Sequence, residues 1–167
     1  IFRIRSGASL LTESELDGLT AWASARTSPD ESFLSYWHIS GFISAYADRP
    51  VVSNTFFENP ANRRNIHEFA ARIFQPEDSL VAMMERKDAD YLVYQADFLL
   101  DAGPSGLLYL AGHTDPPEGS AALLMQYRPD ELRRLELVFQ GPSLRVFSLG
   151  SNHAPPCTSG AGVLFDE

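Results

Sequence analysis

Residues 30–55 read DESFLSYWHISGFISAYADRPVVSNT, and this stretch decides the fold. The short apolar run at 32–35 is typical of a strand, and Tyr36 and Trp37 follow where the chain turns. Apolar residues then recur at helical spacing, which predicts a short helix with one apolar face. The residues of that face are Ile39, Phe42, Ile43 and Tyr46.

The sequence Asp48-Arg49-Pro50 ends this helix, because a residue before proline is pushed out of the α region. The next residues, 51–53, are apolar and β-branched enough to predict a second short strand. The stretch is therefore strand, aromatic corner, helix and strand. Such corners are exposed backbone held by a rigid scaffold, and binding residues concentrate there.

The flanking sequence predicts helices that alternate with strands. A capping box, Thr12 with Glu15, starts a helix that runs to about Arg26. Further helices are predicted at 62–74 with Asn62 as the cap, at 76–87 after a proline, at 107–111 and at 121–127. Residues 91–94 predict a strand, and 135–139 with 144–149 predict a hairpin. The fold class is mixed α/β (α+β), with a small, partly parallel sheet flanked by helices and closed by a β-hairpin.

Composition narrows the possible partners. The chain has 167 residues, which fits one domain, and a net charge of −9. Nucleic acid is not an expected partner, because phosphate backbones require a basic surface, and an anionic membrane surface is disfavoured for the same reason. The single cysteine, Cys157, allows no intrachain disulfide. The chain begins at Ile1 without methionine, as expected of a domain excised from a longer protein or of a processed protein.

The frame of residues 32–94 resembles the region around the W-W-D-Y-G signature in the catalytic subunit of oligosaccharyltransferases. These membrane enzymes transfer a glycan from a lipid carrier to asparagine. The five signature positions fall on Tyr36, Trp37, His38, Ile39 and Ser40. The Arg-Pro that follows the signature in the family falls on Arg49 and Pro50, and the small-Asn-Thr ending falls on Ser53, Asn54 and Thr55. Only Trp37 is identical within the signature, so the motif is divergent.

The resemblance implies that the chain is the extracytoplasmic globular domain of a multi-spanning glycosyltransferase. Residues 1–11 would lead in from an upstream membrane region, 12–149 would form the domain and 150–167 an irregular tail. No catalytic residue would lie in this chain, and the parent's divalent metal, Mg or Mn, would be held by membrane helices and their loops. The partners implied are the chain's own N-terminal transmembrane region, a lipid-linked glycan and the acceptor.

The signature positions are the candidate acceptor-binding residues: Tyr36, Trp37, His38 and Ser40, supported by Arg49 and Asn54. In the family, the signature binds the hydroxyl residue two positions after the acceptor asparagine. Here His38 replaces the aspartate of the signature, which removes a charged hydrogen-bond acceptor. This change predicts that the glycan is transferred to a different acceptor substrate. The alternative is that Tyr36 to His38 form a core corner with a satisfied histidine.

Other features favour simpler interpretations. His113 and Asp115 could be half of a metal site, but no third ligand lies at suitable spacing, which favours a polar loop. Glu77 and Asp78 are typical of charge at a helix start. Phe56 and Phe57 are expected in the core rather than against a membrane. A separate functional hypothesis is a free-standing acidic module that binds or inhibits a protein, suggested by the negative charge and the aromatics.

Overall fold

The computed structural model describes residues 11–96, 99–100, 103–104 and 106–150. Within them, one sheet has the strand order β1-β2-β4-β3. The strands are β1 (Phe33–Ser35), β2 (Tyr91–Gln95), β3 (Leu135–Gln140) and β4 (Leu144–Leu149). β1 pairs with β2 in parallel, whereas β4 pairs antiparallel with both β2 and β3. The predicted mixed α/β class, with a partly parallel sheet that ends in a hairpin, is confirmed.

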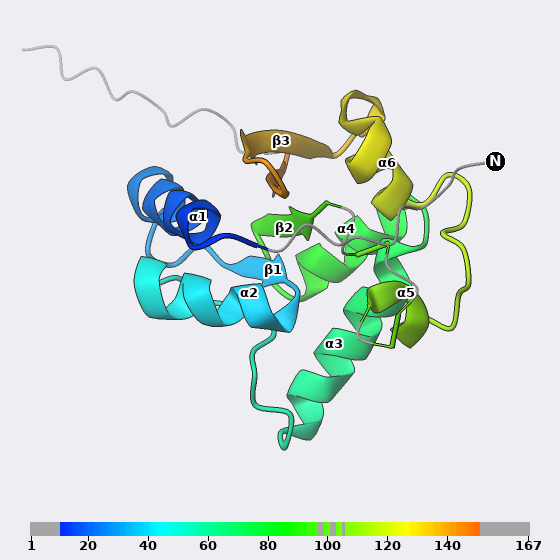
Figure 1. The fold of residues 1–167 in the computed structure, drawn as a ribbon, viewed down its shortest axis with the longest axis horizontal. Coiled ribbons are helices and arrows are strands. Elements are labelled where there is room, and N and C mark those ends of the chain that lie inside the picture. The colour runs from blue at the N-terminus through cyan, green and yellow to red at the C-terminus, as the bar shows by residue number, and fades with distance from the viewer. Residues whose placement is uncertain (1–10, 97–98, 101–102, 105, 151–167) are drawn as a thin grey trace, which may run out of the picture.

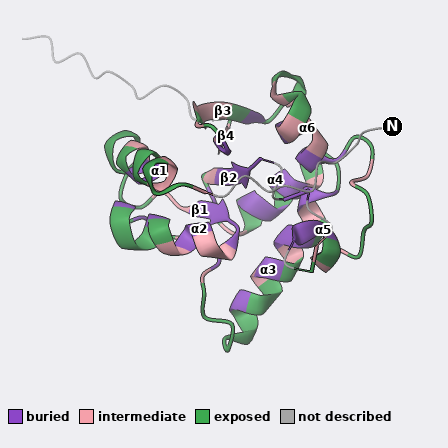
Figure 2. Cartoon of the chain, viewed as in Figure 1, coloured by how far each residue is buried: buried purple, intermediate pink, exposed green. Residues whose placement is uncertain are grey.

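Helices cover both faces of this sheet (Figure 1). One face carries α1, α2 and the π-helical turn η1, and the other carries α3, α4, α5 and α6. Their bounds are α1 (Glu13–Arg26), α2 (Trp37–Phe42), η1 (Ile43–Ala47), α3 (Pro60–Ile73), α4 (Glu77–Arg86), α5 (Leu107–Leu110) and α6 (Ala121–Tyr127), with a 3-10 turn η2 (Pro129–Glu131). Figure 2 shows β1, β2, β4 and the inner sides of these helices as the most buried part of the molecule, whereas the edge strand β3 is mostly intermediate or exposed. Within the described residues, no helix is long and apolar enough to cross a bilayer.

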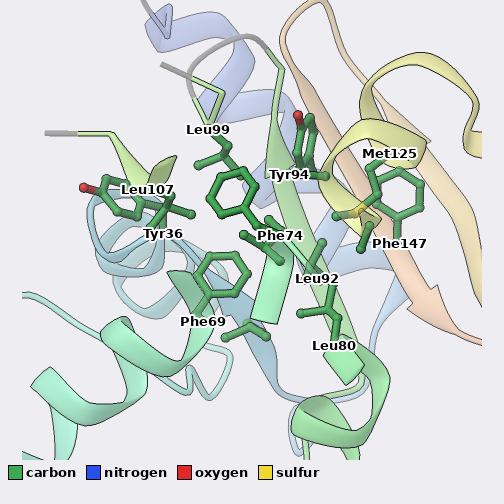
Figure 3. Packing of buried hydrophobic residues seen from close by; sticks show 14 of the residues in the cluster. Tyr36, Phe69, Phe74, Leu80, Leu92, Tyr94, Leu99, Leu107, Met125 and Phe147 are labelled. Carbon is green, nitrogen blue, oxygen red and sulfur yellow. The ribbon is translucent and has the colours of Figure 1, made fainter. Parts of the chain in front are cut away.

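The period-two alternation of the strands divides the core into two clusters. In β2, Leu92 and Tyr94 face α3–α6, while Val93 faces α1 and α2. β1 alternates in the same way, with Leu34 on the first side and Phe33 on the second. Figure 3 shows the larger cluster, in which side chains of the strands interlock with those of α3, α4, α5 and α6. A sheet with both faces covered in this way accounts for the continuous apolar run of β2.

Helix ends follow the predicted signals, with one correction. The Thr12–Glu15 capping box is present at the start of α1, and Pro76 precedes α4 as expected. Asn62, however, does not cap α3. The cap is Asn59, whose side chain accepts from the backbone N–H of Ala61 at 2.8 Å. The helix begins at Pro60, earlier in the sequence than predicted, because the fixed φ of proline suits the first helical position.

Two predictions about residues 30–55 are wrong in detail. Residues 51–53 do not form a strand: Val51 makes an isolated parallel bridge to Phe33, and the Ser53 hydroxyl then donates to the Ser35 carbonyl at 3.0 Å. That hydrogen bond occupies an acceptor that a longer strand would need. In the helix, Phe42 and Tyr46 are exposed instead of buried. The π turn adds a residue, so that Ala47 takes the inward position expected for Tyr46.

Candidate functional site

The aromatic corner lies where the two parallel strands end. β1 ends at Ser35, and the extended backbone of Tyr36 caps α2, with its carbonyl accepting from the N–H groups of Ile39 and Ser40. The carboxyl end of β2 lies alongside, because the parallel register pairs Ser35 with Val93. The His38 Nε2 atom lies 3.0 Å from Oε1 of Gln95, the last residue of β2. The corner is thereby fastened to the neighbouring strand.

The rings at this corner form one cluster in which burial differs between neighbours. Tyr36 is buried, whereas Trp37 and His38 are half-buried. The Tyr36 ring centroid lies 5.0 Å from that of His38 and 5.6 Å from that of Trp37. Phe57 approaches the other side of Trp37 edge to face, at 5.1 Å and 78°. Such edge contacts are favoured by the ring quadrupoles, so Trp37 is held between the corner and the loop before α3.

A pocket of about 290 Å³ opens beside Trp37. The corner, the loop before α3, the α3 face and residues near α5 supply its walls, which are Tyr36, Trp37, Phe57, Arg63, Ile66, His67, Pro104 and Leu110. Most of these side chains are apolar or aromatic, and the two ionisable groups on the α3 wall are basic types. A pocket of aromatic walls with few polar groups is the usual form of a small-ligand or side-chain site.

Burial keeps both ionisable rings of the corner neutral. It lowers the pKa of His38 below 6.5, and the hydrogen bond with Gln95 only partly offsets this effect. Burial likewise raises the pKa of Tyr36, against a smaller opposing effect of a hydrogen bond with Trp37. At pH 7 the imidazole is therefore uncharged. The corner therefore consists of uncharged aromatic rings, without the carboxylate of the W-W-D-Y-G signature.

None of the remaining predicted site residues lines this pocket. Ser40 is fully buried, and its hydroxyl lies 2.6 Å from that of Ser35. Arg49 is also buried, and its guanidinium donates to carbonyls at the end of α1 and at the end of η1. Asn54 is bonded to Asn62 through its backbone N–H and carbonyl, at 2.9 and 2.8 Å. The structure therefore brings Tyr36, Trp37 and His38 together, whereas Ser40, Arg49 and Asn54 are hydrogen-bonded to neighbouring segments outside the pocket.

Sequence reasoning missed the second wall of this pocket. Arg63 and His67 come from α3, and nothing in the local spacing links that helix to Trp37. Phe57, expected in the core, is 42% exposed and forms part of the wall, while Phe56 is 68% exposed. Gln95 was also missed. A polar residue that closes an otherwise apolar strand was the available signal for it.

Other candidate sites do not form clusters. His113 lies in an exposed loop, with its ring edge-on to Phe74 at 5.8 Å. Across the described ranges, no three His, Cys, Asp or Glu side chains lie together, so these residues do not fit a divalent metal site. Cys157 lies outside the described residues.

The fold and the corner define a mixed α/β domain whose candidate site lies at the carboxyl ends of two parallel strands. No protein-family model matches this chain, and no curated protein matches it either. Its structure, however, is similar to two crystal structures of the C-terminal globular domain of oligosaccharyltransferase from Archaeoglobus fulgidus. The first has 18% sequence identity and a TM-score of 0.61, and the similarity covers 84% of this chain and 99% of that one. The second has 18% sequence identity and a TM-score of 0.58, and the similarity covers 86% of this chain and 99% of that one. The chain therefore has the fold of these domains, as the resemblance implied.

Proposed function

We propose that this chain is the extracytoplasmic globular domain of a membrane-spanning glycosyltransferase related to oligosaccharyltransferases. It would help to bind the acceptor, while transfer takes place in membrane helices outside this sequence. The divalent metal and the lipid-linked glycan would be bound there too, as the resemblance implies. The domain alone would not be catalytic.

The observation that carries this proposal is the pocket beside Trp37. The fold likeness extends over 99% of each compared domain, and the corner at Tyr36 and Trp37 opens into a pocket lined by aromatic side chains. Aromatic faces stack on sugars and on apolar side chains of peptides. The half-buried indole of Trp37 is the largest of these faces, and the imidazole of His38 lies edge-on to it, with ring centroids 5.5 Å apart.

A test in the full-length protein uses Trp37→Ala and His38→Ala. We expect Trp37→Ala to lower acceptor affinity by about 10- to 100-fold, since aromatic contacts in such sites contribute about 1–3 kcal/mol. Tyr127→Ala is the matched control, because it removes an aromatic ring that is 48% exposed and does not line the pocket. Unchanged transfer and acceptor affinity in both corner variants would overturn the acceptor role.

The parent architecture is tested separately. Native cells are fractionated and blotted with an antibody against this chain. A band much larger than 18.5 kDa in the membrane fraction, released only by detergent, is the expected result. A soluble band near 18.5 kDa would instead leave a small acidic binding protein.

A further inference from the structure

A second hollow lies between α1 and the α2–η1 segment. Its volume is about 420 Å³, and it shares no lining residue with the pocket at Trp37. The lining residues are Glu13, Leu16, Asp17 and Thr20 from α1, with Phe42 and Tyr46 from the opposite segment. We call this hollow the α1 groove. Figure 1 shows α1 alongside α2 on one side of the sheet, opposite α3 and α5.

One wall of the α1 groove is a stacked aromatic pair. The rings of Phe42 and Tyr46 lie 5.9 Å apart at an interplanar angle of 22°. They are 39% and 72% exposed, although their neighbours Ile43 and Ala47 are buried. The π turn at Ile43–Ala47 produces this arrangement, since it moves Ala47 inward and Tyr46 outward. Single π turns of this kind are frequent at functional sites.

The other wall is acidic. Glu13 and Asp17 are four residues apart on α1 and therefore lie on one helix face, and both are exposed. Thr20 offers little to a ligand, because its hydroxyl donates to the carbonyls of Leu16 and Asp17 at 3.0 and 3.2 Å. Among the residues that the structure describes, no basic side chain lines the groove. Two carboxylates thus face two aromatic rings across a partly enclosed space with an apolar contact at Leu16.

We infer that the α1 groove binds a basic segment of a partner protein. A Lys or Arg side chain would lie over the exposed faces of the aromatic pair and reach the carboxylates of Glu13 and Asp17. Cations are attracted to aromatic faces within about 6 Å, and charge-assisted hydrogen bonds to carboxylates are the stronger kind. An apolar neighbour of that cation would rest on Leu16. The chain's net charge of −9 would speed the approach of such a partner.

This inference is tested by titrating the 167-residue chain with a peptide while NMR monitors the backbone amides of the chain. The probe is the acetylated, amidated peptide Leu-Arg-Leu-Arg-Leu, and its matched control carries citrulline, a neutral isostere, in place of each arginine. We expect the arginine peptide to shift amides of residues 13–20 and 42–46. The citrulline peptide should bind about 10-fold more weakly, because it keeps the shape but loses the charge. Added salt should weaken only the arginine peptide.

Variants locate the binding. Phe42→Ala with Tyr46→Ala, and separately Glu13→Gln with Asp17→Asn, should each weaken the arginine peptide by about 5- to 10-fold. Tyr109→Ala with Tyr127→Ala removes two rings of similar exposure from α5 and α6 and should change nothing. Trp37→Ala should also leave this binding intact, so a failure of the acceptor proposal does not affect the result. Equal affinity for the arginine and citrulline peptides, or no shifts in α1 and 42–46, would overturn the inference.

Discussion

Replacement of Glu77 tests how the start of α4 is joined to the start of β3. Glu77 is the first residue of α4, and its side chain is 8% exposed. Its Oε1 atom accepts from the backbone N–H groups of Arg134 and Leu135, both at 2.9 Å. Both carboxylate oxygens also accept from the N–H of Arg133, at 3.1 and 2.9 Å. One carboxylate therefore binds the start of α4 to the start of β3.

The magnitude follows from these three donors. A hydrogen bond to a charged group contributes about 1.5–3 kcal/mol net, and water can replace part of it at the two partly buried donors. We therefore expect Glu77→Ala to lower the free energy of unfolding by about 3–4 kcal/mol. Glu77→Gln keeps Oε1 as an acceptor without the charge, and charge-assisted bonds are about twice as strong as neutral ones, so we expect about half that loss.

Urea unfolding at pH 7, followed by tryptophan fluorescence, measures these differences. The control is Asp78→Ala, which removes an exposed carboxylate from the same helical turn and loses only its interaction with the helix dipole, about 0.3–1 kcal/mol. Hydrogen exchange of the Leu135 amide should accelerate in Glu77→Ala alone. The reasoning is refuted if Glu77→Ala costs less than about 1 kcal/mol, or no more than Asp78→Ala.

Four further predictions concern the hydrogen bonds of Arg49 and Asn62 and the pH dependence of stability. Arg49→Ala should lower the unfolding free energy by about 2–3 kcal/mol, and Arg49→Lys should recover little, because an ammonium cannot replace the guanidinium fork that reaches both α1 and η1; full recovery in the lysine variant would contradict this. Asn62→Ala should lower the unfolding free energy by about 2 kcal/mol and increase proteolysis at residues 54–58, because the Asn62 side-chain amide donates to two carbonyls of that loop. Unchanged proteolysis would argue against this role of Asn62. Because burial lowers the pKa of His38, its contribution to stability is complete above pH 6.5 and is lost as the pH falls from 6.5 through the folded pKa. In His38→Gln, the urea midpoint should therefore depend less on pH in that window. Burial favours a raised pKa for Glu15, but the hydrogen bonds from Ser143 and Thr12 outweigh this effect and lower the pKa. The stability that Glu15 contributes is therefore lost only as the pH falls below 4.5, and Glu15→Gln should remove this pH dependence.

Local signals in the sequence were enough to predict most elements of this fold. The Thr12–Glu15 capping box, Pro76 and the dense apolar run at Tyr91 each act within a few residues. Their physical causes are capping hydrogen bonds, the fixed φ of proline and burial on both faces of a strand. The corner at Tyr36–His38 was predictable for the same reason, because a strand that ends at aromatics before a helix is a local pattern.

The site required more than local signals. The pocket at Trp37 needs α3 to supply Arg63 and His67, and the fastening of His38 needs Gln95, 57 residues further along the chain. Glu77 was interpreted as ordinary helix-start charge, although it holds β3. These relations arise only when helices pack on the sheet, and sequence spacing carries no record of which distant backbone donors a carboxylate will meet.

The sequence by itself determined the order and type of most elements, the mixed α/β class and the aromatic corner, because each depends on capping, periodicity or turn chemistry over short distances. Tertiary structure alone decided that β2 and β4 are the central strands, that residues 51–53 make only a bridge, and that Phe42, Tyr46, Phe56 and Phe57 are exposed. The physical reason is that burial is a property of packing: an apolar side chain becomes core or binding surface according to which neighbours the fold brings against it.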